Sequence, residues 1–385
     1  MGKSRRVLYI QYKNPALYPP LIQSARILAD DNWEVLFIGV EGSGSSNLSF
    51  PTYQNVNIHN LTFQPPGWRQ KIHYLKYFFR VVREVSQWSP RWIYASDPLS
   101  APIALAVDLA SDTSCIYHEH DSPEPSEIST ASGFQKIVLS CRRHLAKRAD
   151  CCVLPNGGRI DLLQNQTNGE ATAYRVRNVP TKDEVASPRD AAADEIRLMY
   201  QGSLNEKRLP FTVLEALKRV SSSVSLVVVG YETSGHRGFV DEFKHRAERL
   251  EVRDRVNFVG SLPRNELLNL CSQCDIGLAL IPMEPESINM RHMVGASVKP
   301  FDYLSQGLPI LFSDLGEWRK AYGDPGFGLP CDPRNPESIA GAIQSFVSRP
   351  DMLRDFGEAG RRQIMKKWNY ESEFRKVKNL MERKA

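Results

Sequence analysis

The sequence predicts an α/β fold with two doubly wound domains, each a parallel sheet covered by helices on both faces. Three observations predict it: short β-rich runs alternate with longer amphipathic stretches, this alternation occurs twice, and a polar segment separates the two sets. The length of 385 residues is also more typical of two domains than of one.

The first domain is expected over residues 1–180 and contains five runs typical of buried parallel strands. The runs are rich in β-branched and aromatic residues, and longer amphipathic stretches separate several of them. The expected strands are residues 7–10, 35–38, 91–94, 115–117 and 151–154.

The pattern then restarts and predicts a second domain over residues 196–365. Amphipathic stretches at residues 211–221 and 235–250 are expected to be helices between its strands. The expected strands are residues 197–200, 226–229, 256–259, 276–279 and 309–312.

Residues 181–195 lie between the two sets and are expected to be a linker, because they are polar, rich in alanine and poor in large apolar residues. Residues 366–385 are expected to form a C-terminal helix that packs back on the first domain. Two doubly wound domains joined in this way are expected to face a central cleft, because such sheets bind ligands at the carboxyl ends of their strands.

The composition excludes several classes of protein. With 42% hydrophobic and 24% charged residues, and a first apolar run (7–10) too short for a signal peptide or a membrane span, a cytoplasmic protein is expected. The net charge of +5 comes from scattered basic residues, which does not indicate nucleic-acid binding. Seven cysteines with a single CxxC, at residues 271–274, indicate neither a disulfide framework nor a metal site. No G-x-G-x-x-G follows the first strand, which argues against NAD.

Residues 68–83 leave two interpretations open. Aromatic residues are interleaved there with Arg69, Lys71, Lys76, Arg80 and Arg83. A helix whose apolar face packs on the first domain is the favoured interpretation. The alternative is an interfacial helix at the inner membrane surface that meets anionic lipid, which would favour a lipid-linked acceptor.

The most informative stretch is residues 297–310, SVKPFDYLSQGLPI. If residues 298–305 are helical, Lys299 and Asp302 share one face near the helix N-terminus, where the backbone favours an anion. A lysine there can meet phosphate, and a carboxylate can accept hydrogen bonds from two ribose hydroxyls. Taken alone, an ordinary N-terminal charge pair explains the spacing equally well.

Six motifs in order extend this pattern: YQGSLNEK at residue 200, VVVG at 227, VNFVG at 256, CDIG at 274, the stretch from Lys299 to Ile310, and GFGL at 326 followed by Asp332 and Pro333. From residue 200 to about 342 their order resembles the donor-binding half of GT-B glycosyltransferases, in particular glycosyltransferase family 4. The resemblance implies a GT-B fold and transfer of a sugar from a nucleotide-sugar donor.

The resemblance also implies roles for individual residues. The turn at Gly202 would approach the nucleotide diphosphate, with Lys207 and Arg208 as cations. Ser203 stands where the family usually has arginine, so diphosphate binding would depend more on Lys207 and Lys299. By the same resemblance, Asp302 would bind the ribose.

Three further positions follow from the resemblance. Gly230 and the turn at Phe258 and Val259 would hold the base by backbone contacts, although strand-end geometry explains the glycine equally well. The family also has a glutamate eight residues before its ribose-binding carboxylate, and this earlier glutamate faces the donor sugar. Val294 stands at that place here, and neighbouring groups such as the backbone at Gly295 could supply the contact.

In the first half, YHEHD at residue 117 resembles a family 4 segment, and by that alignment His120 is the active-site histidine that bonds the transferred sugar. His118 and His120 share a strand face, but no third ligand is evident and metal is not expected.

The function expected from this resemblance is a glycosyltransferase (EC 2.4 class) of polysaccharide biosynthesis. It would use a UDP- or GDP-sugar without a required cofactor, transfer the sugar with retention to a glycan, lipid-linked or small-molecule acceptor, and rely on His120, Lys207 and Lys299. The alternatives are a non-catalytic glycan-binding or assembly subunit, which Val294 and Ser203 make credible, and a sugar-nucleotide epimerase.

Overall fold

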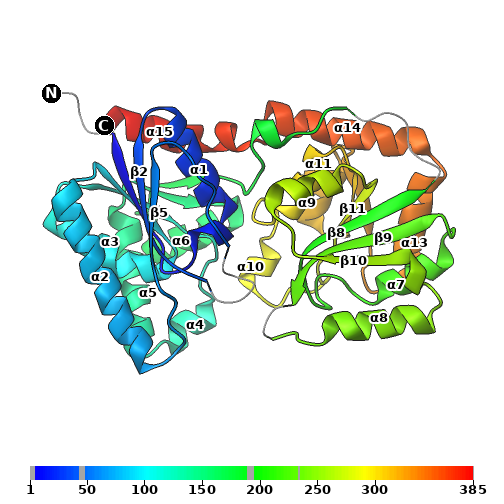
Figure 1. The fold of residues 1–385 in the computed structure, drawn as a ribbon, viewed down its shortest axis with the longest axis horizontal. Coiled ribbons are helices and arrows are strands. Elements are labelled where there is room, and N and C mark those ends of the chain that lie inside the picture. The colour runs from blue at the N-terminus through cyan, green and yellow to red at the C-terminus, as the bar shows by residue number, and fades with distance from the viewer. Residues whose placement is uncertain (1–4, 43–47, 189–194, 233–234, 385) are drawn as a thin grey trace. The chain divides into compact units, whose positions relative to one another are not determined.

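The computed structural model describes residues 5–42, 48–188, 195–232 and 235–384 (Figure 1). The chain forms two compact units. The first consists of Met1–Asn178 and Tyr370–Ala385, and the second of Val179–Asn369. Each unit contains one parallel sheet, so the predicted fold class of two doubly wound domains is confirmed.

The first unit is built on a seven-stranded parallel sheet with the order β3-β2-β1-β4-β5-β6-β7. Its strands are β1 (Arg6–Ile10), β2 (Glu34–Val40), β3 (Val56–Leu61), β4 (Trp92–Ser96), β5 (Ser114–His118), β6 (Cys151–Leu154) and β7 (Ala173–Arg175). Its helices are α1 (Pro19–Asp30), α2 (Trp68–Trp88), α3 (Ala101–Ala110), α4 (Pro125–Thr130), α5 (Gly133–Arg148), α6 (Gly157–Thr167) and α15 (Tyr370–Lys384).

Strand alternation sends successive side chains of β1 to opposite faces of the sheet. Leu8 and Ile10 join a core that includes residues of α2, α3 and α5. Tyr9 points the other way, and its hydroxyl donates to Ser24 Oγ of α1 at 3.0 Å. The order of strands reverses between β1 and β4, so the crevice for a ligand is expected at their carboxyl ends.

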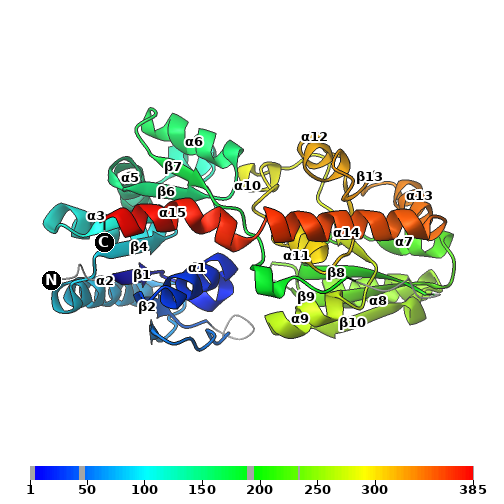
Figure 2. The same cartoon turned by 90° about the horizontal axis from the view of Figure 1, so that it is seen from above.

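The last helix, α15, belongs to the first unit although it follows the second in the chain (Figure 2). Its buried face contributes Tyr370, Phe374, Val377 and Met381, each 0% exposed. Near its start, Glu373 Oε1 accepts from Arg177 Nη1 at 2.5 Å. The final helix therefore completes the sheet-covering layer that α1 begins.

The second unit has a six-stranded parallel sheet with the order β10-β9-β8-β11-β12-β13. Its strands are β8 (Ile196–Leu204), β9 (Val224–Glu232), β10 (Val256–Gly260), β11 (Ile276–Ala279), β12 (Ile310–Ser313) and β13 (Gly328–Cys331). Its helices are α7 (Thr212–Arg219), α8 (Phe239–Arg249), α9 (Arg264–Cys271), α10 (Ile288–Arg291), α11 (Lys299–Ser305), α12 (Gly316–Trp318), α13 (Pro336–Val347) and α14 (Pro350–Lys366).

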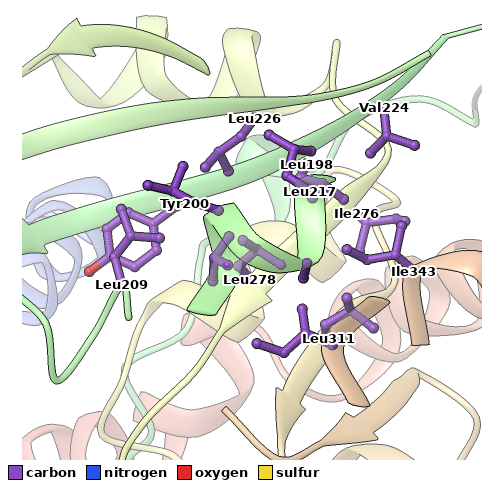
Figure 3. Close-up of a cluster of buried hydrophobic side chains, with 14 of the residues drawn as sticks. Leu198, Tyr200, Leu209, Leu217, Val224, Leu226, Ile276, Leu278, Leu311 and Ile343 are labelled. Atoms are coloured by element: carbon purple, nitrogen blue, oxygen red, sulfur yellow. The ribbon is translucent and has the colours of Figure 1, made fainter. Parts of the chain in front are cut away.

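Aliphatic side chains of β8, β9, β11 and β12 interlock with those of α7 and α13 in the core of this unit (Figure 3). Leu198, Leu226, Leu278 and Leu311 are each 0% exposed. This core fixes the strands whose carboxyl ends carry the glycines described below.

The described part of the expected linker packs against the second unit. Residues 181–188 belong to the second unit, where Ala186 N donates to Ser305 O at 3.0 Å and Glu184 accepts from Arg264 Nη2 at 3.0 Å. Residues 189–194 of that segment lie outside the described residues. In the described parts of the chain, no helix is both long and apolar enough to cross a membrane.

Candidate functional site

Two glycines meet at the carboxyl ends of β8 and β9. Gly202 and Gly230 are register partners with φ of 120° and 151°. A Cβ on Gly230 would lie 1.8 Å from the carbonyl oxygen of Gly202, and one on Gly202 would lie 2.7 Å from Cε of Lys299. Both positions therefore require glycine, and both residues are half-buried at the carboxyl edge of the sheet.

Lys299, the first residue of α11, brings an amine to the same place. Its Nζ donates to the hydroxyl of Tyr200 at 3.0 Å and lies 4.2 Å from the centre of that ring. The Tyr200 hydroxyl in turn donates to the carbonyl of Ser203 at 2.7 Å. Desolvation, and then the charge of Arg208, lower the pKa of Lys299 well below its ordinary value. An anion bound beside it would reverse that shift.

The two cations of the turn after β8 have different surroundings. Arg208 is half-buried, and its charge acts on both Lys299 and Tyr200. Lys207 is exposed and bonds Glu286 at 2.5 Å. The structure thus brings Gly202, Gly230, Lys299 and Arg208 together, whereas Lys207 points to an exposed carboxylate.

Asp302, which is expected to bind the ribose, contacts side chains of two other elements. It is 0% exposed, and its oxygens accept from Arg264 Nη2 at 3.0 Å, Arg264 Nη1 at 3.3 Å and Gln201 Nε2 at 3.0 Å. Burial raises the pKa of this carboxyl, although Arg264 opposes the shift. Because α11 turns Asp302 inward, its carboxylate holds α9 and β8 in place.

The turn expected to hold the base lies at the end of β10, and Gly295, expected near the donor sugar, lies between α10 and α11. Phe258 is half-buried and packs edge-on against Phe243, with ring centres 5.7 Å apart. Val259 is 37% exposed, and Gly295 adopts a φ of 85°. β10 pairs with β9, the strand that carries Gly230.

In the first unit, His120 follows β5 and is 8% exposed. Its Nε2 lies 3.0 Å from Ser96 Oγ, and its ring lies 4.6 Å from that of Tyr18. Burial, aided by Lys13 and Arg159, lowers its pKa to about 3. His120 is therefore a neutral hydrogen-bonding group at the carboxyl edge of this sheet.

A carboxylate that the sequence analysis left without a role lies beside His120. Asp97, directly after β4, adopts a φ of 65°, a costly conformation for a residue with a side chain. Its Oδ2 accepts from Gln11 Nε2 at 3.2 Å and lies 3.9 Å from Lys13 Nζ. Burial raises the pKa of this carboxyl, and Lys13 opposes the shift. No motif marks these residues; the only available signal was that each follows a predicted strand.

Comparison with known proteins agrees with this arrangement. Residues 182–363 match the family described as glycosyl transferases group 1. Glycogen synthase from Mycobacterium tuberculosis is 23% identical over 307 residues, which cover 74% of this chain and 67% of that protein. Sucrose-phosphate synthase from Thermosynechococcus elongatus has a similar fold, with a TM-score of 0.75 at 16% identity over 98% of both chains. The second unit thus matches a group 1 glycosyltransferase domain, and the chain has the GT-B fold.

A second solved structure shares the fold of this glycosyltransferase. Anabaena HepE, in complex with UDP and glucose, has a TM-score of 0.71 at 16% identity over 98% of this chain and 99% of that one. The family match lies wholly within the second unit, which also carries Gly202, Gly230 and Lys299. The expectation of a glycosyltransferase enzyme is confirmed.

The described residues of the glycosyltransferase contain no group of three or more His, Cys, Asp and Glu side chains placed to hold a metal ion. His118 and His120 are close, with ring centres 4.1 Å apart, but His118 Nδ1 lies 2.9 Å from the Tyr94 hydroxyl. Glu119 points to the other side of the sheet, where Arg142 Nη2 donates to it at 2.7 Å. The His-Glu-His sequence is thus accounted for by hydrogen bonds and a buried ion pair.

Proposed function

We propose that the second unit binds the diphosphate of a nucleotide-sugar donor at Gly202, Gly230 and Lys299. The observation that carries this proposal is the desolvated amine of Lys299, which lies against Gly202 beside a second cation, Arg208. Two cations and side-chain-free backbone at the carboxyl ends of parallel strands suit an anionic ligand. HepE, with its bound UDP and glucose, makes UDP the first nucleotide to test.

Catalysis in this proposal depends on the leaving group. As the bond between the sugar and the diphosphate breaks, negative charge accumulates on the phosphate oxygens, and Lys299 and Arg208 stabilise it. Such cations speed the reaction because their interaction strengthens in the transition state. Lys207 joins them only if it leaves Glu286, to which it is bonded here.

The first unit is proposed to bind the acceptor, which is a glycan, a lipid-linked sugar or a small molecule. His120, neutral above a pKa of about 3, would hydrogen-bond the transferred sugar, and Asp97 and Lys13 would hold hydroxyls nearby. Retention of configuration, as the family resemblance implies, is part of the proposal, and NMR of the anomeric proton in the first product formed tests it.

A calorimetric panel tests the donor. UDP, GDP, ADP, CMP and dTDP are titrated into the full-length protein, and then the matching nucleotide sugars are assayed for release of the nucleotide with and without simple sugar acceptors. One nucleotide class should bind, and release should require an acceptor. Failure of every nucleotide to bind folded protein would contradict the proposal and favour a non-catalytic binding subunit, whereas isomerisation of the sugar without an acceptor would favour an epimerase.

A further inference from the structure

The helix α2 has two apolar faces, which is unusual for a helix on the outside of a sheet. The inner face buries His73, Tyr74, Tyr77 and Val81 against the first unit. The outer face carries Trp68, Ile72, Leu75, Phe79 and Val82, which are 67%, 46%, 56%, 67% and 38% exposed. The sequence interpretation of a simply covered helix thus accounts for only one of the two faces.

The exposed residues form a single line. Their spacing of four, three, four and three residues keeps them on one side of the helix, over about 21 Å of its length. Figure 1 shows α2 at the outside of the first unit beside α3. We call Trp68, Ile72, Leu75, Phe79 and Val82 the outer stripe.

Cations border the outer stripe. Five basic residues of α2 are exposed, and the single acidic residue, Glu84, is half-buried with its Oε2 3.7 Å from Arg80. By helical geometry, four of the cations lie along one border of the stripe and one along the other. They are Arg69, Lys76, Arg80 and Arg83 on the first side and Lys71 on the second.

Apolar surface continues onto the neighbouring helices. On α5, Phe134 is 44% exposed and meets Tyr74 edge-on at 5.1 Å, and Ile137 is 58% exposed. A groove of about 690 Å³ lies between α2 and α3, and residues of both helices line it, among them Phe78, Val82 and Val107. The apolar area is thus wider than one helix and is not an isolated exposed residue.

We propose that the outer stripe of α2 lies on the surface of a lipid bilayer with anionic headgroups. The apolar side chains would enter the boundary between headgroups and acyl chains, and the bordering cations would meet lipid phosphates. An anionic bilayer fits both the apolar outer stripe and the cations that border it. A nucleic acid would leave the apolar line in water, and a second copy packed on the same face would bring like charges together.

Flotation of the full-length protein with vesicles tests the proposal. Vesicles of phosphatidylcholine mixed with phosphatidylglycerol should carry the protein upward, and vesicles of phosphatidylcholine alone should carry much less. Each basic residue near an anionic surface strengthens binding by about fivefold, so Lys71→Gln with Arg83→Gln should weaken it by roughly 25-fold, and added salt should weaken it too.

Trp68→Ser with Phe79→Ser tests the stripe itself and should reduce flotation by at least about tenfold. Met365→Ser, which changes a 38% exposed apolar residue of the second unit, is the matched control. All replaced side chains are on the surface, so circular dichroism should show folded proteins. Flotation that persists in both double variants, or that ignores phosphatidylglycerol, overturns the proposal. A dimer abolished by Trp68→Ser with Phe79→Ser, without any vesicle binding, assigns the stripe to a second copy instead.

Discussion

Replacing Lys299 by methionine should affect the free protein and the donor complex in opposite directions. Methionine keeps an unbranched chain that can pack on the Tyr200 ring, which the lysine amine approaches to 4.2 Å. It removes the ammonium, whose charge is disfavoured by desolvation and by Arg208. We therefore expect the unliganded variant to be at least as stable as the wild type, and the variant to bind the donor nucleotide more weakly.

The expected changes in nucleotide affinity and in stability both follow from the loss of the positive charge of Lys299. A hydrogen bond from an ionised amine to a diphosphate is worth about 1.5–3 kcal/mol, so Kd should rise roughly 10- to 150-fold. The pKa of Lys299 is lowered on folding, so the unfolded chain binds more protons between that value and 10.5. Wild-type stability should therefore rise with pH in this window, by at most about 1.4 kcal/mol per pH unit, and Lys299→Met should remove that slope.

Calorimetric titration gives the nucleotide affinity, and urea denaturation between pH 7 and 9 gives the stability, interpreted through proton linkage. Lys218→Met is the control, because Lys218 is an exposed lysine whose Nζ lies 3.6 Å from Glu251. It should change neither quantity. The reasoning is refuted if Lys299→Met destabilises the unliganded protein at every pH and leaves the nucleotide affinity unchanged, because the amine would then be structural.

Three further substitutions test other parts of the structure. Gly230→Ala should cost about 2–4 kcal/mol in urea denaturation, because its Cβ meets the Gly202 carbonyl and φ is 151°; a loss below about 0.5 kcal/mol would contradict the geometry. Arg142→Met should cost about 3–5 kcal/mol by leaving Glu119 buried without its cation, and unchanged stability would show that water reaches that carboxylate. His120 has a folded pKa of about 3, below its ordinary 6.5, so wild-type stability should fall as pH falls from 6.5 towards 3. His120→Gln should reduce that slope in thermal melts, and an unchanged slope would mean that His120 does not titrate as the structure implies.

Ten strands were predicted from sequence, and all ten appear in the structure with bounds close to those expected. Nine of them lie inside a sheet, where burial on both faces gives a continuous apolar run, and the tenth, β10, is an edge strand. The three that were not predicted, β3, β7 and β13, all lie at sheet edges. β3 is polar and largely exposed, β7 has three residues, and β13 contains Pro330, which a central strand would not tolerate.

The residues of the candidate site that could be predicted from sequence are those whose motif reflects the geometry of the backbone. Gly202, Gly230 and Lys299 come together because strand ends and one helix start place them there, and their spacing is visible in the sequence. The inward turn of Asp302 was not visible, because it depends on Arg264, which lies 38 residues away on another helix. Asp97 was not assigned a role for the same reason: its partners Gln11 and Lys13 come from a distant loop without a motif.

The position of α15 has a consequence for biosynthesis. The first unit is covered in part by α15, which follows the second unit in the chain, so during translation the surface that Phe374 and Met381 cover stays exposed until the second unit has been synthesised. A chain truncated before α15 would lack that cover and become a substrate for chaperones and proteases. The position of α15 thus makes complete folding of the first unit depend on synthesis of the second.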